Sequence, residues 1–225
     1  MNSDDLIQAM ISYYSARAPW HDKYMNWTGM AALEELLAPI ITWIEPLVQG
    51  RDLLEVACGT GNWTQVLSRR ARSVLATDVA DSALDIARRK CRDLDNVTFL
   101  VADAYKLRGL DVSFDAAIAI DWWSHIPKMS IPVFLESLRS NLKERANVIF
   151  IDIGYQECFA RETIRFDEDG NRISRRTLPN GLEFDVVKNF PTEVELKAML
   201  DDFGEDIVYR EHGELKRWMV FCRLK

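Results

Sequence analysis

Residue types that would point to a disulfide-rich or metal-binding protein are scarce in this sequence. Its 225 residues include four cysteines and three histidines. The cysteines are Cys58, Cys91, Cys158 and Cys222, and no two of them form a C-x-x-C pair. The histidines also lack the spacing of metal ligands. We therefore expect reduced thiols and no metal ion, rather than a disulfide framework or a zinc site.

Long apolar runs and excess positive charge are absent as well. No apolar segment approaches the roughly 20 residues that span a membrane. The first residues carry Asp4 and Asp5 and lack the basic and apolar parts of a signal peptide. The 28 Lys and Arg residues against 35 Asp and Glu give a formal net charge of −7, which argues against binding by phosphate neutralisation. We expect a cytoplasmic monomer or homodimer without a membrane or nucleic-acid partner.

Tryptophan, in contrast, is frequent. The sequence is 48% apolar and 28% charged, which supports a buried core, and it contains 7 tryptophans. Because the indole group combines a large apolar area with one N–H donor, tryptophan is often found where ligands or partners bind.

Short apolar segments alternate with amphipathic helical segments in the middle of the chain. The predicted strands are residues 53–57, 73–77, 97–101, 114–120 and 147–153. Strands that are apolar along their whole length are buried on both faces, and the intervening helices indicate a parallel sheet with two covered faces. The expected fold class is therefore α/β.

The flanking regions follow other patterns. Residues 1–50 are predicted to be helical, with a break at Ala18-Pro19. Pro179-Asn180-Gly181 indicates a hairpin within residues 154–190. Residues 191–225 are predicted to contain a helix and an antiparallel pair of strands. We expect one domain over residues 1–225, with its core at 51–153. The arginines of the hairpin region are expected at a solvated edge, and they are Arg165, Arg172, Arg175 and Arg176.

Polar groups follow the predicted strands at the edge where such sheets bind ligands. Glu55 and the loop Gly59-Thr60-Gly61 end the first strand, and Asp78, Asp103 and Asp121 end the next three. Glycines allow the loop backbone to approach a ligand closely. Asp78 suits the two hydroxyls of a ribose, and Asp103 suits an exocyclic amine such as that of adenine. These positions predict a site for an adenosine-containing cofactor.

Two kinds of cofactor are compatible with an adenosine site. A dinucleotide site requires G-x-G-x-x-G, but Thr64 stands where the third glycine belongs. Glu55 would repel a pyrophosphate and attract a cation. An adenosine cofactor with an ammonium or sulfonium group therefore fits better than NAD.

The motifs in this region resemble those of class I S-adenosylmethionine-dependent methyltransferases of the small bacterial type that acts on small molecules. Leu53–Gly61 resembles motif I, Ala76–Leu84 the segment after it, Val101–Ala104 the adenine-binding motif, and Phe114–Ile120 the fourth strand. The resemblance covers residues 50–153 with all motifs in order. It implies a Rossmann-like three-layer sandwich with a mostly parallel seven-stranded sheet and an antiparallel last strand, and S-adenosylmethionine (SAM) as the cofactor.

The same resemblance implies a set of cofactor-binding residues. Tyr13–Ala18 resembles a lid segment in which a tyrosine and an arginine approach the cofactor carboxylate. Arg17 suits that partner, although an exposed surface arginine is the alternative. The expected cofactor-binding residues are Tyr14, Arg17, Glu55, Ala57, Gly59, Gly61, Asp78, Val79, Asp103, Ala104, Asp121 and Trp122.

Catalytic and acceptor-binding candidates follow the fourth strand. Methyl transfer from a sulfonium mainly requires alignment, and it needs a base only when the nucleophile is protonated. His125 and Asp121 are the catalytic candidates, and the alternative for His125 is to satisfy a loop carbonyl. The residues expected to contact the acceptor are Trp20, His21, Trp122 and Trp123. We expect five tryptophans on this face, and they are Trp20, Trp27, Trp63, Trp122 and Trp123.

The predicted function is methyl transfer from SAM to an oxygen or nitrogen of a small, aromatic or apolar molecule. Nucleic-acid amine methyltransferases usually carry Asn/Asp-Pro-Pro-aromatic after the fourth strand, whereas Asp121 is followed here by Trp122-Trp123. A nucleic-acid or protein methyltransferase remains an alternative. An alternative of another class is a non-catalytic SAM-binding regulatory module.

Overall fold

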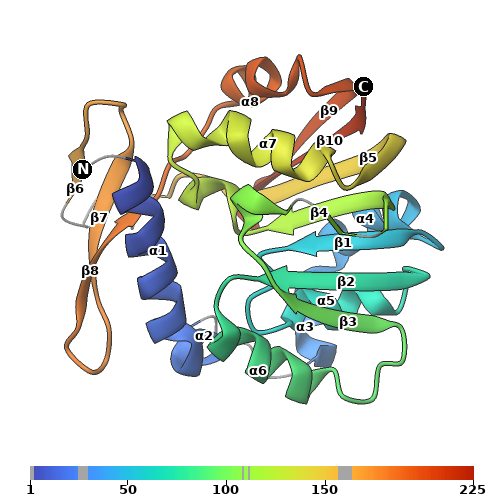
Figure 1. Ribbon diagram of the computed structural model, residues 1–225, viewed down its shortest axis with the longest axis horizontal. Helices are drawn as coiled ribbons and strands as arrows, with labels where there is room; N and C mark the ends of the chain where they lie inside the picture. Colours follow the sequence, from blue (N-terminus) through green and yellow to red (C-terminus); the bar gives the residue numbers. More distant parts are fainter. Residues whose placement is uncertain (1–2, 25–29, 108, 111, 157–163) are drawn as a thin grey trace.

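The five predicted strands form the parallel part of a seven-stranded sheet in the computed structural model (Figure 1). The structure describes residues 3–24, 30–107, 109–110, 112–156 and 164–225. The parallel strands are β1 (Asp52–Val56), β2 (Ser73–Asp78), β3 (Val97–Val101), β4 (Phe114–Ile120) and β5 (Leu142–Ile153). The order is β3-β2-β1-β4-β5-β10-β9, so the direction of the chain across the sheet reverses between β1 and β4. Ligands bind beside such a reversal, at the carboxyl ends of the strands.

Two C-terminal strands complete this sheet. β10 (Arg217–Leu224) runs antiparallel to β5, and β9 (Gly204–His212) runs antiparallel to β10. Thr192 and Glu195 form a capping box at the start of α8 (Glu193–Leu200), the helix predicted in this region. The α/β fold class with an antiparallel strand near the end of a mostly parallel sheet is therefore confirmed.

Helices bury both faces of the sheet, as the apolar strands predicted. On one face, Leu53 of β1 belongs to a core formed with α3 (Met30–Leu36), α4 (Ala38–Val48) and α5 (Asn62–Ser68). On the other, Leu54 packs in a core formed with α7 (Ile131–Arg139) and α8. α6 (Asp81–Lys90) packs against β2 and β3. Among the described residues, no helix combines the length and apolarity needed to cross a membrane.

A second, smaller sheet lies beyond the carboxyl edge of the large one. It consists of β6 (Ile164–Phe166), β7 (Arg172–Thr177) and β8 (Glu183–Val187) in antiparallel order. The predicted hairpin joins β7 and β8, whereas β6 was not predicted. On this sheet Arg165 and Arg175 pair with Asp185, but Arg172 is buried beside the ring of Phe190. The expectation that all four arginines form a solvated edge is therefore wrong for Arg172.

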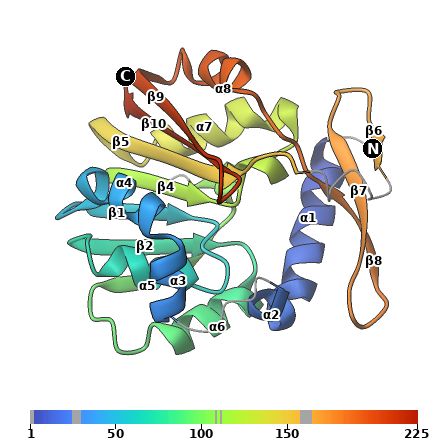
Figure 2. The same cartoon turned by 180° about the vertical axis from the view of Figure 1, so that it is seen from behind.

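The first helix connects the two sheets. Figures 1 and 2 show α1 (Ser3–Arg17) between the small sheet and the carboxyl edge of the large sheet. Leu6, Met10 and Tyr13 on one side of α1 pack against Ile173 and Val187 of the small sheet. Helix α1 ends before the predicted break, and the short helices η1 (Ala18–Trp20) and α2 (His21–Tyr24) follow. We call residues 3–24 the N-terminal segment.

Candidate cofactor and catalytic site

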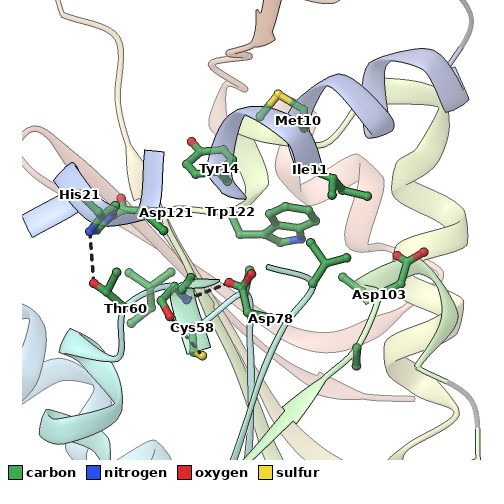
Figure 3. Close-up of a pocket in the computed structure, with 18 of the residues that line it drawn as sticks. Met10, Ile11, Tyr14, His21, Cys58, Thr60, Asp78, Asp103, Asp121 and Trp122 are labelled. Atoms are coloured by element: carbon green, nitrogen blue, oxygen red, sulfur yellow. Dashed lines mark hydrogen bonds between the residues drawn. The ribbon is translucent and has the colours of Figure 1, made fainter. Parts of the chain in front are cut away.

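A cavity lies between the carboxyl edge of the large sheet and the N-terminal segment (Figure 3). It is lined by residues that follow β1, β2, β3 and β4, and by α1 and α2. Its lining includes these expected residues: Tyr14, His21, Ala57, Gly59, Asp78, Val79, Asp103, Ala104, Asp121 and Trp122. In Figure 3, Asp103 lies at one end of the cavity, His21 and Thr60 lie at the other, and Tyr14 and Trp122 lie between.

The glycines of the loop after β1 have different roles. Gly59 has a φ of +56°, and a Cβ atom there would meet no atom within 4 Å, so this position leaves space for a ligand. Gly61 has a φ of +77°, and its Cβ would lie 2.8 Å from the Cβ of Ala87 on α6. Gly61 does not line the cavity. It therefore allows close packing of the loop on α6, whereas Gly59 faces the cavity.

Asp78 links the glycine loop to the end of β2. Its Oδ2 accepts a hydrogen bond of 2.9 Å from the backbone N–H of Gly59, and its Oδ1 accepts one of 2.9 Å from Ala80. Burial raises the pKa of the Asp78 carboxyl. Because each carboxylate oxygen has two acceptor sites, both oxygens retain capacity for a ligand hydroxyl.

Asp103 occupies the corresponding position after β3. Its Oδ1 accepts a hydrogen bond of 2.9 Å from the backbone N–H of Tyr105, which begins the turn that places Ala104 in the cavity wall. Two indole N–H groups of the lining, those of Trp63 and Trp122, are buried and have no hydrogen-bond partner among the described residues. Such donors suit a ligand with acceptor atoms, and the donor set fits an adenosine cofactor.

Glu55 lies beneath the loop and does not line the cavity. Its side chain is 2% exposed and accepts a hydrogen bond of 2.7 Å from the hydroxyl of Thr64. Thr64 is the residue that replaces the third glycine of a dinucleotide motif, so this replacement supplies the partner of Glu55. Burial raises the pKa of Glu55 to about 8.

Asp121 is paired with an arginine that the sequence analysis did not identify. Its backbone adopts a φ of +57° at the end of β4, and both carboxylate oxygens accept hydrogen bonds from the guanidinium of Arg217 on β10. Burial alone would raise the pKa of Asp121, but Arg217 holds it below its usual range. Protonation of Asp121 would break this ion pair, so the arrangement fixes Asp121 as a charged group beside the cavity.

His125 is buried behind the cavity wall. The Tyr14 hydroxyl lies 2.6 Å from its Nε2, and the backbone oxygen of Val187 lies 2.7 Å from its Nδ1. A carbonyl oxygen only accepts, so Nδ1 carries the proton and Nε2 accepts from Tyr14. Burial, followed by the neighbouring ammonium of Lys188, holds the pKa of His125 well below its usual value. His125 therefore satisfies a backbone carbonyl through Nδ1, and its Nε2 lone pair also allows the predicted role as a base.

Lys188 and Asp152 form a buried pair next to His125. The Nζ of Lys188 donates a hydrogen bond of 2.7 Å to Ser124 Oγ and lies 3.6 Å from Asp152 Oδ1. Asp152 also accepts from the backbone N–H and the hydroxyl of Ser124. An aspartate within the apolar segment of β5 was a signal for such a site, but Lys188 had no signal in its local sequence.

The N-terminal segment is attached to the glycine loop through Asp22. Its Oδ1 accepts from the Thr60 hydroxyl at 2.7 Å and from Asn62 Nδ2 at 2.9 Å, and its Oδ2 lies 2.5 Å from Lys90 Nζ. Burial opposes ionisation, but these hydrogen bonds and that of His21 hold the pKa of Asp22 well below its usual range. His21 was predicted from the sequence to lie at this site, whereas Asp22 was not.

Several expected residues lie away from the cavity. Trp123 is buried in the core against Phe150 and Trp218, and Trp20 packs with the cluster of α1 and the small sheet, so neither lines the cavity. The Arg17 guanidinium lies over the Tyr14 ring, 5.7 Å from its centre, and is also outside the lining. Trp27 lies outside the described residues. The tryptophans therefore do not form one face, because local sequence does not show which side of an element they take.

Comparisons with known proteins identify the family of the chain. A family model described as a methyltransferase domain matches residues 53–145. Solved structures of DhpI with SAH and with SAM and HEP are each 33% identical to the chain. The match to the SAH complex covers 99% of this chain and 98% of the DhpI chain, with a TM-score of 0.74. The match to the complex with SAM and HEP covers 99% of this chain and 100% of the DhpI chain, with a TM-score of 0.76. The PH0226 protein of Pyrococcus horikoshii OT3, at 19% identity and a TM-score of 0.72 over 89% of this chain and 94% of that one, shows the same fold.

Curated relatives match over shorter lengths. A tRNA/tmRNA (uracil-C(5))-methyltransferase of Campylobacter concisus is 41% identical over 71 residues, which are 30% of this chain and 19% of that protein. A demethylmenaquinone methyltransferase of Staphylococcus aureus is 36% identical over 70 residues, which are 30% of this chain and 29% of that protein. The chain thus spans less than a third of these two relatives. The match to DhpI, in contrast, extends over nearly all of both chains. The chain therefore belongs to the class I S-adenosylmethionine-dependent methyltransferases, with SAM as its cofactor.

Proposed function

We propose that this chain transfers the methyl group of SAM to an oxygen or nitrogen of a small aromatic or apolar molecule. The proposal rests on one observation, which is that the N-terminal segment covers the cavity. The N-terminal segment lies across the strand ends, and Asp22 fastens it to the glycine loop through Thr60 and Asn62. An acceptor must then fit beneath this segment, which favours a small molecule over a duplex or a folded protein.

Residues of the lining support binding of the cofactor along the cavity. Asp78 suits the ribose and Asp103 with Ala104 suits the adenine, and this arrangement would direct the methionine part towards Gly59 and Thr60. Bound SAM supplies an electrophilic methyl group on a positively charged sulfur. Arg217 keeps Asp121 ionised next to that part of the cavity. The buried indole N–H groups of Trp63 and Trp122, which have no partner among the described residues, support a ligand that brings acceptor atoms.

The remaining wall supports an apolar acceptor. Ile7 and Ile11 of α1 line the cavity together with Trp122. Apolar walls exclude water, and an indole ring provides a flat surface for an aromatic group. The net charge of −7 also disfavours a polyanionic acceptor.

The proposal is tested by binding and turnover with two matched variants. Titration calorimetry should show SAH binding to the wild type and to the control variant Asp81→Ala. This variant removes an exposed carboxylate three positions after Asp78 in the sequence. Asp78→Ala should bind SAH at least about 10-fold more weakly, since it loses the ribose partner and the support of Gly59.

Radiolabelled SAM should then be incubated with small O–H and N–H acceptors, with tRNA and with peptides. Transfer to a small acceptor is expected. Transfer to RNA or peptide alone would overturn the small-molecule proposal, and SAH binding without transfer to any acceptor would favour a regulatory module.

A further inference from the structure

Tyr14 separates His125 from the cavity. The Tyr14 side chain lines the cavity, and its ring lies at the end of α1, above Asp121 and Trp122 in the view of Figure 3. His125 is 7% exposed, does not line the cavity, and has its Nε2 capped by the Tyr14 hydroxyl at 2.6 Å. A group bound in the cavity therefore meets Tyr14 before His125. Direct proton transfer to His125, as the sequence suggested, is not what this arrangement favours.

The direction of the hydrogen bond between these residues is fixed. Because Nδ1 of His125 donates to the carbonyl of Val187, its Nε2 has only a lone pair to offer. The Tyr14 hydroxyl must therefore donate to Nε2. Its oxygen retains lone pairs that can accept a hydrogen bond from a molecule in the cavity. The geometry thus forms a two-step path from the cavity to a buried imidazole.

Charged groups around this pair favour a neutral imidazole. Lys188 Nζ lies 3.5 Å from Nε2 and is held there by Ser124 and Asp152. Arg17 and Arg176 also act on His125 as positive charges, while Asp152 is the negative charge that acts on Tyr14. Burial and these cations disfavour the imidazolium, so His125 remains a free base and does not retain a proton for long.

We propose that Tyr14 is a catalytic residue that relays the proton of the acceptor to His125, and that Lys188, which contacts Nε2 of His125 and the hydroxyl of Ser124, is a positioning residue for this pair. This inference rests on the proposed methyl transfer. The acceptor O–H or N–H bond breaks, and its proton passes to the Tyr14 oxygen while the Tyr14 proton passes to Nε2. The lone pair of the acceptor atom forms the bond to the methyl carbon as the carbon–sulfur bond breaks onto sulfur. The products are the methylated acceptor, the neutral thioether and a protonated His125, which returns its proton to water.

The first test observes the histidine itself, without cofactor or acceptor. Nitrogen-15 NMR of histidine-labelled protein, assigned with His125→Gln, should show His125 as the neutral Nδ1–H tautomer at pH 7. Tyr14→Phe should move the Nε2 resonance towards that of a free lone pair, and Tyr13→Phe should not. Lys188→Met should raise the pKa of His125, with His212 as internal reference. An Nε2–H tautomer, a charged His125 at pH 7, or no response to Tyr14→Phe would overturn the relay.

The second test separates a relay from simple cofactor binding by Tyr14. If Tyr14 is a relay, Tyr14→Phe should bind SAH within about threefold of the wild type, as measured by titration calorimetry. Affinity lost by more than about 10-fold would instead assign Tyr14 to the cofactor and overturn the proposal.

With an acceptor from the panel, Tyr14→Phe and His125→Gln should each lower kcat by about 10²- to 10⁴-fold, and the double variant should lose little more. Full activity of Tyr14→Phe would refute the relay alone. Absence of transfer by the wild type would refute the proposed function, and the NMR result would still decide the state of His125.

Discussion

At the scale of single residues, the carboxylates that follow the strands are chemically distinct. Asp78 holds two backbone N–H groups, Asp121 is neutralised by Arg217, and Glu55 is buried with a single hydroxyl partner, Thr64. The same residue class thus provides a support for the glycine loop, a fixed ion pair and a buried acid. Neighbouring groups decide among these roles, because burial and partner charge set the proton affinity of each carboxyl.

The buried Glu55 should make stability depend on pH. Its pKa is about 8 in the folded protein and 4.5 as an ordinary glutamate, so the folded state retains a proton that the unfolded chain loses. The free energy of unfolding should therefore fall as pH rises from about 4.5 to about 8. Glu55→Gln cannot ionise and should lose less stability over this range, by an amount on the order of 4 kcal/mol.

Urea unfolding of the wild type and Glu55→Gln at pH 5 and pH 8 measures this difference. Glu136→Gln, at an exposed position of α7, is the matched control and should follow the wild type. Equal pH dependence of the wild type and Glu55→Gln would show that Glu55 titrates normally in the folded protein.

At the scale of elements, the N-terminal segment and the glycine loop form one interlocked unit. Asp22 joins α2 to the loop, and Lys90 from the end of α6 contacts both Asp22 and Asn62. The Ser82 hydroxyl at the start of α6 also donates to the backbone oxygen of Ser15 on α1. Elements that follow two different strands thus hold the cover of the cavity in place.

Removing the charge of Asp22 should loosen this cover. Asp22→Asn keeps the shape of the side chain but weakens its contact with Lys90, which is a charge-assisted hydrogen bond. Hydrogen exchange in residues 3–24 should accelerate by about 10-fold or more, with β4 and β5 unaffected, and SAH should dissociate faster. Asp85→Asn, which removes an exposed partner of Arg88, is the control. Unchanged exchange in the N-terminal segment would mean that Asp22 does not hold it.

At the scale of the whole molecule, the protein has a platform and a cover. The platform is the seven-stranded sheet with its helices, and it carries the residues that line the strand-end side of the cavity. The cover is the N-terminal segment together with the small sheet packed against it (Figure 2). The cover has its own apolar cluster, in which Met10, Ile173 and Val187 are buried. Tyr14 lies on the cover and His125 on the platform, so their hydrogen bond crosses the boundary between the two parts.

A cavity in the apolar cluster of the cover should loosen the cover without affecting the platform. Met10 is 3% exposed, and its sulfur accepts from the backbone N–H of Val187. Met10→Ala should lower the local opening free energy of α1, β7 and β8 by about 2 to 5 kcal/mol. Hydrogen exchange resolved by element measures this, with the exposed substitution Val133→Ala as control. Equal loss of protection in β1 and β4 would show that cover and platform unfold together.

The sequence by itself determined the platform and the cofactor end of the site. Alternating apolar segments predicted the parallel sheet, and the loop at Gly59 with Asp78 and Asp103 predicted an adenosine cofactor. These signals are local, because a strand and the turn after it are adjacent in the chain. Only the tertiary structure brought Tyr14, His125 and Lys188 together. Tyr14 and His125 are 111 positions apart, and Lys188 directly follows β8 of the small sheet, so their contact depends on how distant elements pack and not on any local pattern.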